Sequence, residues 1–230
     1  MELPIDGILL VDKPAGWSSF DVVAKVRGTL KRETGHKIKV GHTGTLDPLA
    51  TGLMIIVVGS YCKRAVEFTK LDKTYEVTMK LGQTSTTGDE EGEKTVVSDY
   101  QPAPEQVLEA LDSFIGDSMQ VPPAFSAVKV DGKRAYKLAR EGKVVELEAR
   151  PVRINNIHQD DYSYPLVQFS ADVSSGTYIR SLVQDIGEKL QTGAYMANLR
   201  RNRVADFVVE DAIDLSEIDF AKITTNLRQI

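Results

Sequence analysis

The apolar positions along the chain predict several strands. Residues 7–11 and 53–58 are continuous apolar runs, and the short length and β-branching of 53–58 favour a buried strand over a helix. Residues 73–81 alternate between apolar and polar positions, as in a strand with one buried face. Residues 166–173 predict a further strand.

Three other segments place apolar residues at helical spacing. The first helix is expected after Ser18, which forms a capping-box pattern with Asp21, and Gly35 is expected to end it. A second begins near Pro104, a residue favoured in the first helical turn. The third is predicted over residues 176–190, which carry one apolar stripe.

Strands and helices intermix without regular βαβ repetition, so we predict an α+β fold with a mixed sheet. Residues 120–150 differ from the rest. They combine two prolines, a strand-like stretch over 125–130, an Asp-Gly turn at 131–132 and a basic helix over 133–140. We interpret them as a basic excursion from the main body. The acidic residues 86–94 predict an exposed loop.

Composition limits the class of protein. A chain of 230 residues with 42% hydrophobic and 27% charged residues is an ordinary globular protein. The longest apolar run has six residues, far below the ~20 that span a bilayer, and the first residues lack a secretory signal. A single cysteine, Cys62, excludes an intrachain disulfide. We therefore expect a cytoplasmic protein without membrane association.

The net charge of −5 argues against a nucleic-acid partner, but the charges are segregated. Six Lys or Arg and one Glu lie within residues 22–42, and eight cations and four acids within 127–153. A third basic cluster comprises Arg200, Arg201 and Arg203. Basic faces on an acidic protein are typical of contacts with a phosphate backbone.

Residues 41–52, Gly-His-Thr-Gly-Thr-Leu-Asp-Pro-Leu-Ala-Thr-Gly, are the most distinctive segment. Three glycines and a proline predict a sharply folded loop that can approach a ligand closely. Asp47 is held before Pro48, which disfavours helical geometry and helps to present the carboxylate. From composition alone, an Asx-type turn remains the alternative to catalysis for Asp47.

Other chemistries lack support in the sequence. The loop is neither a P-loop nor a dinucleotide-binding motif, and the Gly-x-Ser-x-Gly elbow of serine hydrolases is absent. The three histidines, His36, His42 and His158, lack the spacing of metal ligands, so we predict no metal. A glycosidase normally needs two carboxylates, and nothing in the sequence nominates a partner for Asp47.

These segments resemble, in order and over about two hundred residues, the motifs of the TruB-type bacterial tRNA pseudouridine synthases. The matching segments are residues 7–16 with Ser18 and Ser19, residues 41–52, residues 73–75, residues 81–89, residues 176–182 and residues 199–201. The resemblance implies the pseudouridine synthase fold, with a mostly antiparallel central sheet flanked by helices. It also implies an isomerase that converts a T-loop uridine of tRNA, position 55, to pseudouridine.

The resemblance implies catalytic roles for three residues. Asp47 supplies the essential carboxylate, which could attack the base at C6, attack the sugar at C1′ or abstract the C2′ proton; the sequence does not choose among these routes. Arg180 is the expected partner of that carboxylate. Tyr75 is expected to stack on the flipped uracil and to help remove the C5 proton.

Three further residues are expected to bind the substrate. His42 is implied to enter the T loop where the target nucleotide leaves, Tyr178 to shape the pocket near Arg180, and Leu199 to line the uracil site. Lys13 and Pro14 are interpreted as structural residues that pack against the catalytic loop.

The basic excursion resembles the family's inserted arm. Its expected RNA-backbone contacts are Lys129, Lys133, Arg134, Lys137 and Arg140. The sequence is thus interpreted as a single catalytic domain, residues 1–230, carrying this arm. Because only about thirty residues follow Leu199, the family's usual C-terminal RNA-binding domain is expected to be absent.

The expected partner is the tRNA T stem-loop, bound by a monomer that needs no cofactor and no protein partner. Three alternatives remain at this point. The chain could be a non-catalytic tRNA-binding or folding module, it could modify another RNA such as rRNA, or it could hydrolyse a nucleoside or nucleotide with Asp47.

Overall fold

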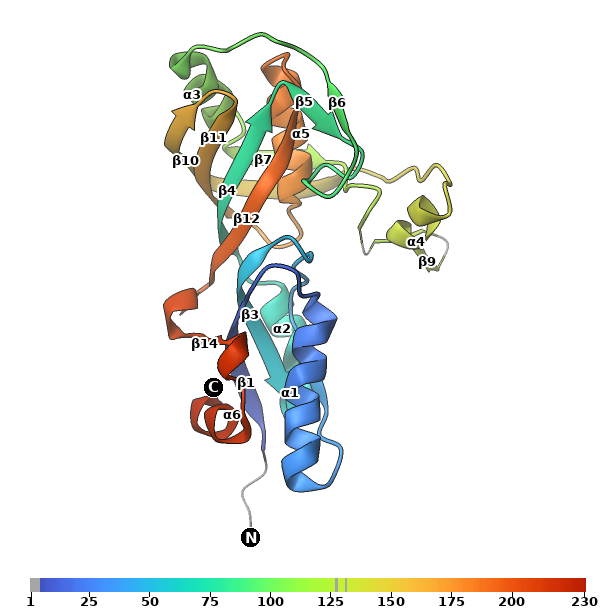
Figure 1. Ribbon diagram of the computed structural model, residues 1–230, viewed down its shortest axis with the longest axis vertical. Helices are drawn as coiled ribbons and strands as arrows, with labels where there is room; N and C mark the ends of the chain where they lie inside the picture. The colour runs from blue at the N-terminus through green and yellow to red at the C-terminus, as the bar shows by residue number, and fades with distance from the viewer. Residues whose placement is uncertain (1–4, 127, 131) are drawn as a thin grey trace. The chain divides into compact units, whose positions relative to one another are not determined.

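The computed structural model describes residues 5–126, 128–130 and 132–230, and the chain divides into two compact units (Figure 1). The first unit comprises Met1–Tyr75 and Arg200–Ile230, and the second comprises Glu76–Leu199. Two strands, β4 (Lys73–Leu81) and β12 (Ala194–Val204), have residues in both units. None of the helices among the described residues is both long and apolar enough to cross a bilayer.

The first unit is built on strands in the order β14-β1-β3-β12. The β1 and β3 strands pair antiparallel, whereas β14 on β1 and β12 on β3 pair in parallel. Its elements are β1 (Gly7–Lys13), α1 (Ser19–Thr34), β2 (Val40–His42), β3 (Thr51–Val58), a 3₁₀ helix (Gly59–Arg64), α2 (Ala65–Thr69), β13 (Phe207–Val208), a 3₁₀ helix (Val209–Asp211), β14 (Ile213–Asp214), a 3₁₀ helix (Leu215–Glu217) and α6 (Phe220–Asn226).

The apolar runs of β1 and β3 form the centre of this unit. Nearly every residue of both strands is buried, on both faces, which explains why their sequences are continuously apolar. One face packs into a cluster that also includes Phe68 and Val209. The α1 helix has the expected capping box between Ser18 and Asp21, and it ends at Gly35 in the left-handed conformation.

The second unit contains strands in the order β12-β4-β11-β10-β7. Strand β10 pairs antiparallel with both β11 and β7. The remaining elements are β5 (Gln83–Ser85), β6 (Lys94–Val96), α3 (Pro104–Asp112), β7 (Gly116–Gln120), β8 (Lys129–Val130), β9 (Lys133–Arg134), α4 (Ala135–Arg140), β10 (Arg150–Ser163), β11 (Leu166–Val173) and α5 (Ile179–Lys189).

The predicted α+β fold with a mixed, mostly antiparallel sheet is confirmed. Three local expectations need correction. The α5 helix begins at Ile179, after a turn, and not at residue 176. Between β7 and β10, the described part of the arm has strand structure only in the β8–β9 hairpin, and Asp131 of the predicted turn lies outside the described residues. The acidic loop is exposed in part only, because Asp89 is buried.

Candidate active site

The loop that carries Asp47 connects β2 to β3 and is attached to its surroundings by backbone groups. The backbone N–H of Thr43 donates to the carbonyl oxygen of Ile55 at 3.2 Å. The hydroxyl of Ser19, at the start of α1, accepts from the N–H of Leu46 and donates to its carbonyl, both at 2.8 Å. The Leu46 side chain is buried, so the residue before Asp47 is fixed by both packing and hydrogen bonds.

Lys13, at the end of β1, joins this loop to the turn before α1. Its side chain is fully buried, and Nζ donates to the carbonyl oxygens of Pro14 at 2.9 Å, Trp17 at 2.7 Å and Pro48 at 3.3 Å. Three carbonyls satisfy the three protons of the ammonium group. Lys13 therefore packs against the loop of residues 41–52, as expected from the sequence.

Arg201 holds the other end of the loop. The side chain is 2% exposed; Nε donates to the carbonyl of Leu53 at 2.7 Å and Nη2 to that of Gly44 at 3.1 Å. Gly52 pairs with Arg201 across β3 and β12 and has a φ of +101°. A Cβ at Gly52 would lie 2.3 Å from the Arg201 carbonyl oxygen, so only glycine permits this approach.

The buried cations set the electrostatics around Asp47. Burial lowers the pKa of Lys13 to about 8; the Asp47 carboxylate opposes this shift and the Arg201 guanidinium adds to it. Burial, and then Arg201, also lowers the pKa of His42. The Nδ1 atom of His42 is buried and has no hydrogen-bond partner among the described residues. His42 is therefore neutral at physiological pH. Asp47 lies close enough to the buried Lys13 to act on its pKa.

The lowered pKa of Lys13 predicts a pH-dependent stability. Because the unfolded chain holds this proton up to about pH 10 and the folded chain only to about pH 8, raising the pH between these values favours the folded state. We expect the unfolding free energy of the wild type, relative to Lys13→Met, to rise by roughly 2–3 kcal/mol from pH 7 to pH 10. Urea titrations at several pH values measure this difference, and a difference that does not change with pH would contradict it.

In the second unit, the buried Arg180 side chain contacts three oxygen atoms that accept hydrogen bonds or pair with its charge. Its Nη1 lies 3.4 Å from Oδ2 of Asp89, and both side chains are less than a tenth exposed. Nη1 also donates to the carbonyl of Thr87 at 3.0 Å, and Nη2 to that of Phe125 at 2.8 Å. The guanidinium is thus oriented by a charged partner and by two backbone carbonyls.

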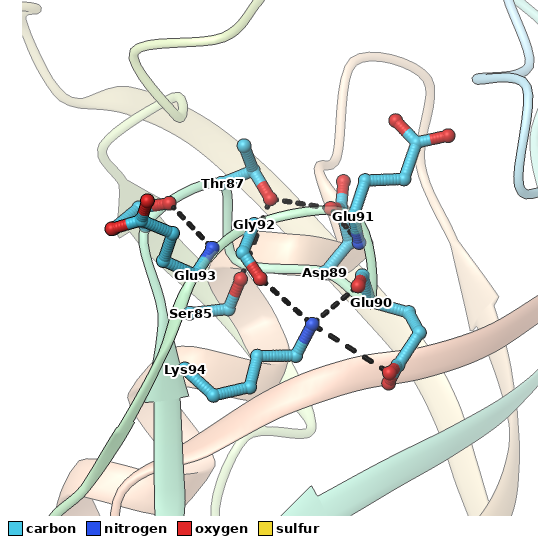
Figure 2. A network of polar contacts seen from close by, with 9 residues as sticks. Ser85, Thr87, Asp89, Glu90, Glu91, Gly92, Glu93 and Lys94 are labelled. Carbon is cyan, nitrogen blue, oxygen red and sulfur yellow. Dashed lines mark hydrogen bonds and ion pairs between the residues drawn. The ribbon is translucent and has the colours of Figure 1, made fainter.

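The loop of residues 85–94 holds Asp89 in turn (Figure 2). The hydroxyl of Thr87 donates to Oδ1 of Asp89 at 2.5 Å, and the backbone N–H of Glu91 donates to the same oxygen at 3.1 Å. Lys94 closes the loop, because Nζ donates to the carbonyls of Glu90 and Gly92. This network positions the Asp89 carboxylate against Arg180.

The other expected site residues fall into the two units as follows. Tyr75 is a buried residue of β4 in the first unit. His42, the last residue of β2, and Asp47 of the loop lie in the same unit and are half-buried. Tyr178 in the second unit is the N-cap of α5, where the side chain of Gln120 bonds both its N–H at 2.8 Å and its carbonyl at 3.1 Å.

Leu199 is buried in β12, also within the second unit. Arg180 and Asp47 belong to different units, and their pairing stays a prediction. Asp89 and Arg201 were assigned no individual role from the sequence, although both lie in motifs that carried the resemblance. Their positions at the ends of those motifs were the signal that could have identified them.

Comparison with protein families decides the assignment. The model described as "TruB family pseudouridylate synthase (N terminal domain)" matches residues 31–179, and that of a tRNA pseudouridylate synthase B C-terminal domain matches residues 180–229. The chain belongs to the TruB family. The predicted enzyme class, an isomerase that forms pseudouridine, is confirmed.

Individual proteins agree with this membership. The chain is 45% identical to a tRNA pseudouridine synthase B of Clostridium novyi, over 93% of this chain and 72% of the relative. It is 47% identical to a protein of the same name from Phocaeicola vulgatus, over 90% of this chain and 89% of the relative.

Among solved structures, a chain in a Cbf5–Nop10–Gar1 complex has 27% identity and a TM-score of 0.71. The match covers 94% of this chain but only 56% of that one, so the TruB-family chain spans little more than half of it. The interpretation as one catalytic domain lacking the usual C-terminal RNA-binding domain stays a prediction.

Proposed function

We propose that this protein converts the uridine at position 55 in the T loop of tRNA to pseudouridine, with Asp47 as the essential carboxylate. The observation that carries the proposal is the loop of residues 41–52. It carries Asp47 close to the buried cation Lys13, and hydrogen bonds of Lys13, Ser19 and Arg201 attach it to β1, α1 and β12. The names of the relatives from Clostridium and Phocaeicola support tRNA as the substrate.

The reaction breaks the C–N glycosidic bond, rotates the uracil and joins its C5 to the same ribose carbon. The C5 proton leaves at the end and N1 gains a proton, so the product is an isomer of the substrate at the same oxidation state and the reaction requires no redox cofactor. Asp47 acts in its ionised form by attack at C6 or C1′, or by removal of the C2′ proton. Arg180 would stabilise the carboxylate, and Tyr75 would stack on the uracil.

The target uridine must leave the stack to reach Asp47, at an unstacking cost of a few kcal/mol. A neutral imidazole can fill an apolar space between bases without the penalty of burying a charge. The lowered pKa of His42 supports this role, in which His42 takes the place of the flipped nucleotide. Tyr178 and Leu199 would complete the pocket for the base.

The arm would bind the backbone of the T stem-loop. The five arm cations predicted to contact RNA are all exposed: Lys129, Lys133, Arg134, Lys137 and Arg140. Exposed flexible cations neutralise phosphates and position the RNA but carry no sequence information. They would therefore contribute to affinity, and the loop of residues 41–52 to chemistry.

Replacing one arm cation should weaken binding without slowing chemistry. For Lys133→Ala we expect a higher Kd and a salt dependence of log Kd that is shallower by about 0.7–0.9 for one lost phosphate contact. The single-turnover rate at saturating enzyme should not change. Filter binding at several salt concentrations and quenched-flow kinetics measure the two effects.

Lys222→Ala provides the control, because Lys222 is an exposed lysine of α6 paired with Glu217 at 3.3 Å, outside the arm. It should leave both quantities unchanged. A large fall in the single-turnover rate of Lys133→Ala would show that the arm takes part in chemistry.

The test of the function is incubation of the protein with an unmodified tRNA transcript, followed by mapping of pseudouridine with a carbodiimide probe. The expected result is a single new reverse-transcription stop, caused by the carbodiimide adduct on a pseudouridine at position 55. Binding without modification would favour a tRNA-folding module. Modification only of rRNA would favour another RNA substrate, and release of free uracil would favour a hydrolase. A monomer in the cytoplasm, where tRNA is modified, is part of the proposal.

A further inference from the structure

Two aromatic side chains are exposed at the start of α1, next to the turn that Lys13 joins to the Asp47 loop. Trp17 is 38% exposed and Phe20 is 64% exposed. A cation lies over each ring: Nζ of Lys25 is 5.7 Å from the Trp17 ring centroid, and the guanidinium carbon of Arg27 is 5.6 Å from that of Phe20. Pairs of exposed rings, each with its own cation, differ from the isolated apolar residues common on protein surfaces.

The α1 helix, drawn in blue in Figure 1, carries four Lys or Arg and two acids. Lys37 and Lys39 follow it in the sequence. Both acids have partners: the Asp21 carboxylate accepts from the N–H and hydroxyl of Ser18 in the capping box, and Glu33 pairs with Arg32 at 3.0 Å. Hydrogen bonds with Ser216 lower the pKa of a third carboxylate, Asp214 of β14, and Lys25 adds to this shift, so Lys25 also lies near an acid. Residues 17–39 thus hold more cations than acids.

The same residues are attached directly to the Asp47 loop. Lys13 Nζ bridges the carbonyls of Trp17 and Pro48, and the backbone N–H of Gly16 donates to Pro48 at 2.8 Å. The Ser19 hydroxyl bonds both backbone groups of Leu46. An RNA that delivers a uridine to Asp47 must therefore pass near the start of α1.

We propose that the α1 face, defined by Trp17, Phe20, Lys25, Arg27 and Lys31, binds unpaired nucleotides of the substrate RNA next to the flipped uridine. Bases stack on the Trp17 and Phe20 rings, and phosphates contact Arg27 and Lys31. The proposal rests on the proposed function, because it takes the same RNA as its ligand. An acidic protein segment would use the cations but would leave the two flat rings without a matching surface.

Trp17 is the only tryptophan of the chain, so its fluorescence reports on this face alone. The experiment titrates unmodified tRNA transcript into the full-length Asp47→Asn protein, which is chosen so that no turnover occurs. We expect quenching of the emission and protection from acrylamide, both saturating at the Kd obtained by filter binding. Bound RNA with unchanged emission and unchanged acrylamide access would overturn the proposal.

Two polyanions without bases distinguish base stacking on Trp17 from attraction to the cations alone. Heparin has no bases, and poly-glutamate represents an acidic protein segment; neither should protect Trp17 from acrylamide as the RNA does. Protection by heparin equal to that by RNA would overturn the stacking part of the proposal. Protection by poly-glutamate but not by RNA would assign the α1 face to an acidic protein and overturn the proposal.

Variants test the contribution to affinity. Base–aromatic stacking predicts a Kd raised about tenfold or more for Trp17→Ala, a smaller rise for Phe20→Ser and near wild-type affinity for Trp17→Phe, which keeps a ring. Leu108→Ala is the matched control, because Leu108 is an exposed apolar residue on α3 between Glu105 and Glu109. Equal affinity of the Trp17→Ala and Leu108→Ala proteins would overturn the proposal.

The failure of this inference can be told apart from failure of the proposed function. If Trp17→Ala binds and modifies the transcript like the wild type, the α1 face has no role and the proposed function stands. If the wild type neither binds nor modifies the transcript, the proposed function fails and this inference fails with it.

Discussion

Asp47→Asn abolishes pseudouridine formation while the protein still folds and binds RNA: this is the largest effect that we expect. Asparagine has nearly the same size but no charge, so it can neither attack the substrate nor accept a proton. Loss of the essential nucleophile or base should lower the single-turnover rate by at least about 10³-fold. Tritium release from tRNA labelled at C5 of uridine measures the rate, and filter binding measures the affinity.

The control is Asp206→Asn, which changes an exposed aspartate in the turn between β12 and β13 of the same unit. It should release tritium at the wild-type rate. Turnover of Asp47→Asn within a few-fold of the wild type would show that another group supplies the carboxylate, and the assigned roles would then be wrong.

The second large effect is expected at the buried pair of Arg180 and Asp89. Removing one partner leaves a buried charge without compensation, so Asp89→Ala should lower the unfolding free energy by about 3–5 kcal/mol. Turnover should fall as well, because the guanidinium loses its charged anchor. Arg180→Lys should also lower the turnover. A single ammonium group cannot donate to the carbonyls of both Thr87 and Phe125 in the geometry of the planar guanidinium.

Urea unfolding of single and double variants tests this pair. The double variant Asp89→Ala/Arg180→Met should lose less stability than the two single variants together, because the charges are removed in pairs. Arg153→Met is the control: Arg153 pairs with Asp117 at 3.1 Å in the same unit, but both are exposed, and the loss should be below about 1 kcal/mol. A loss for Asp89→Ala as small as that of the control would contradict the prediction.

The elements that the sequence predicted well are those with strong local signals. Strands β4 and β11 have the predicted bounds, since each alternates without interruption. The α1 helix has both its capping box and its terminal glycine, Gly35, within the local sequence. Such signals depend only on neighbouring residues, so no tertiary contact was needed to find them.

Strand β10 was not predicted, although it is the longest strand in the described part of the chain. The pairing register with β11 shifts between Ile154 and Asn156, and again between Gln159 and Asp161. Each bulge adds one residue to the strand. After Val152 and Ile154, the next buried residue is therefore Ile157, whereas strict alternation would bury residue 156. The period-2 pattern is thereby lost from the sequence, and only pairing with neighbouring strands reveals the strand.

The sequence by itself determined the family and the α+β fold, because ordered motifs of turn and apolar residues are local and specific; the same motifs predicted Asp47 as the essential carboxylate. The tertiary structure decided the surroundings of the site. It placed Lys13 and Arg201, from opposite ends of the chain, around one loop, and it paired Arg180 with an aspartate from a loop that its charges predicted to be exposed. Burial, buried ion pairs and shifted pKa values arise from residues distant in the sequence, and spacing alone carries no information about them.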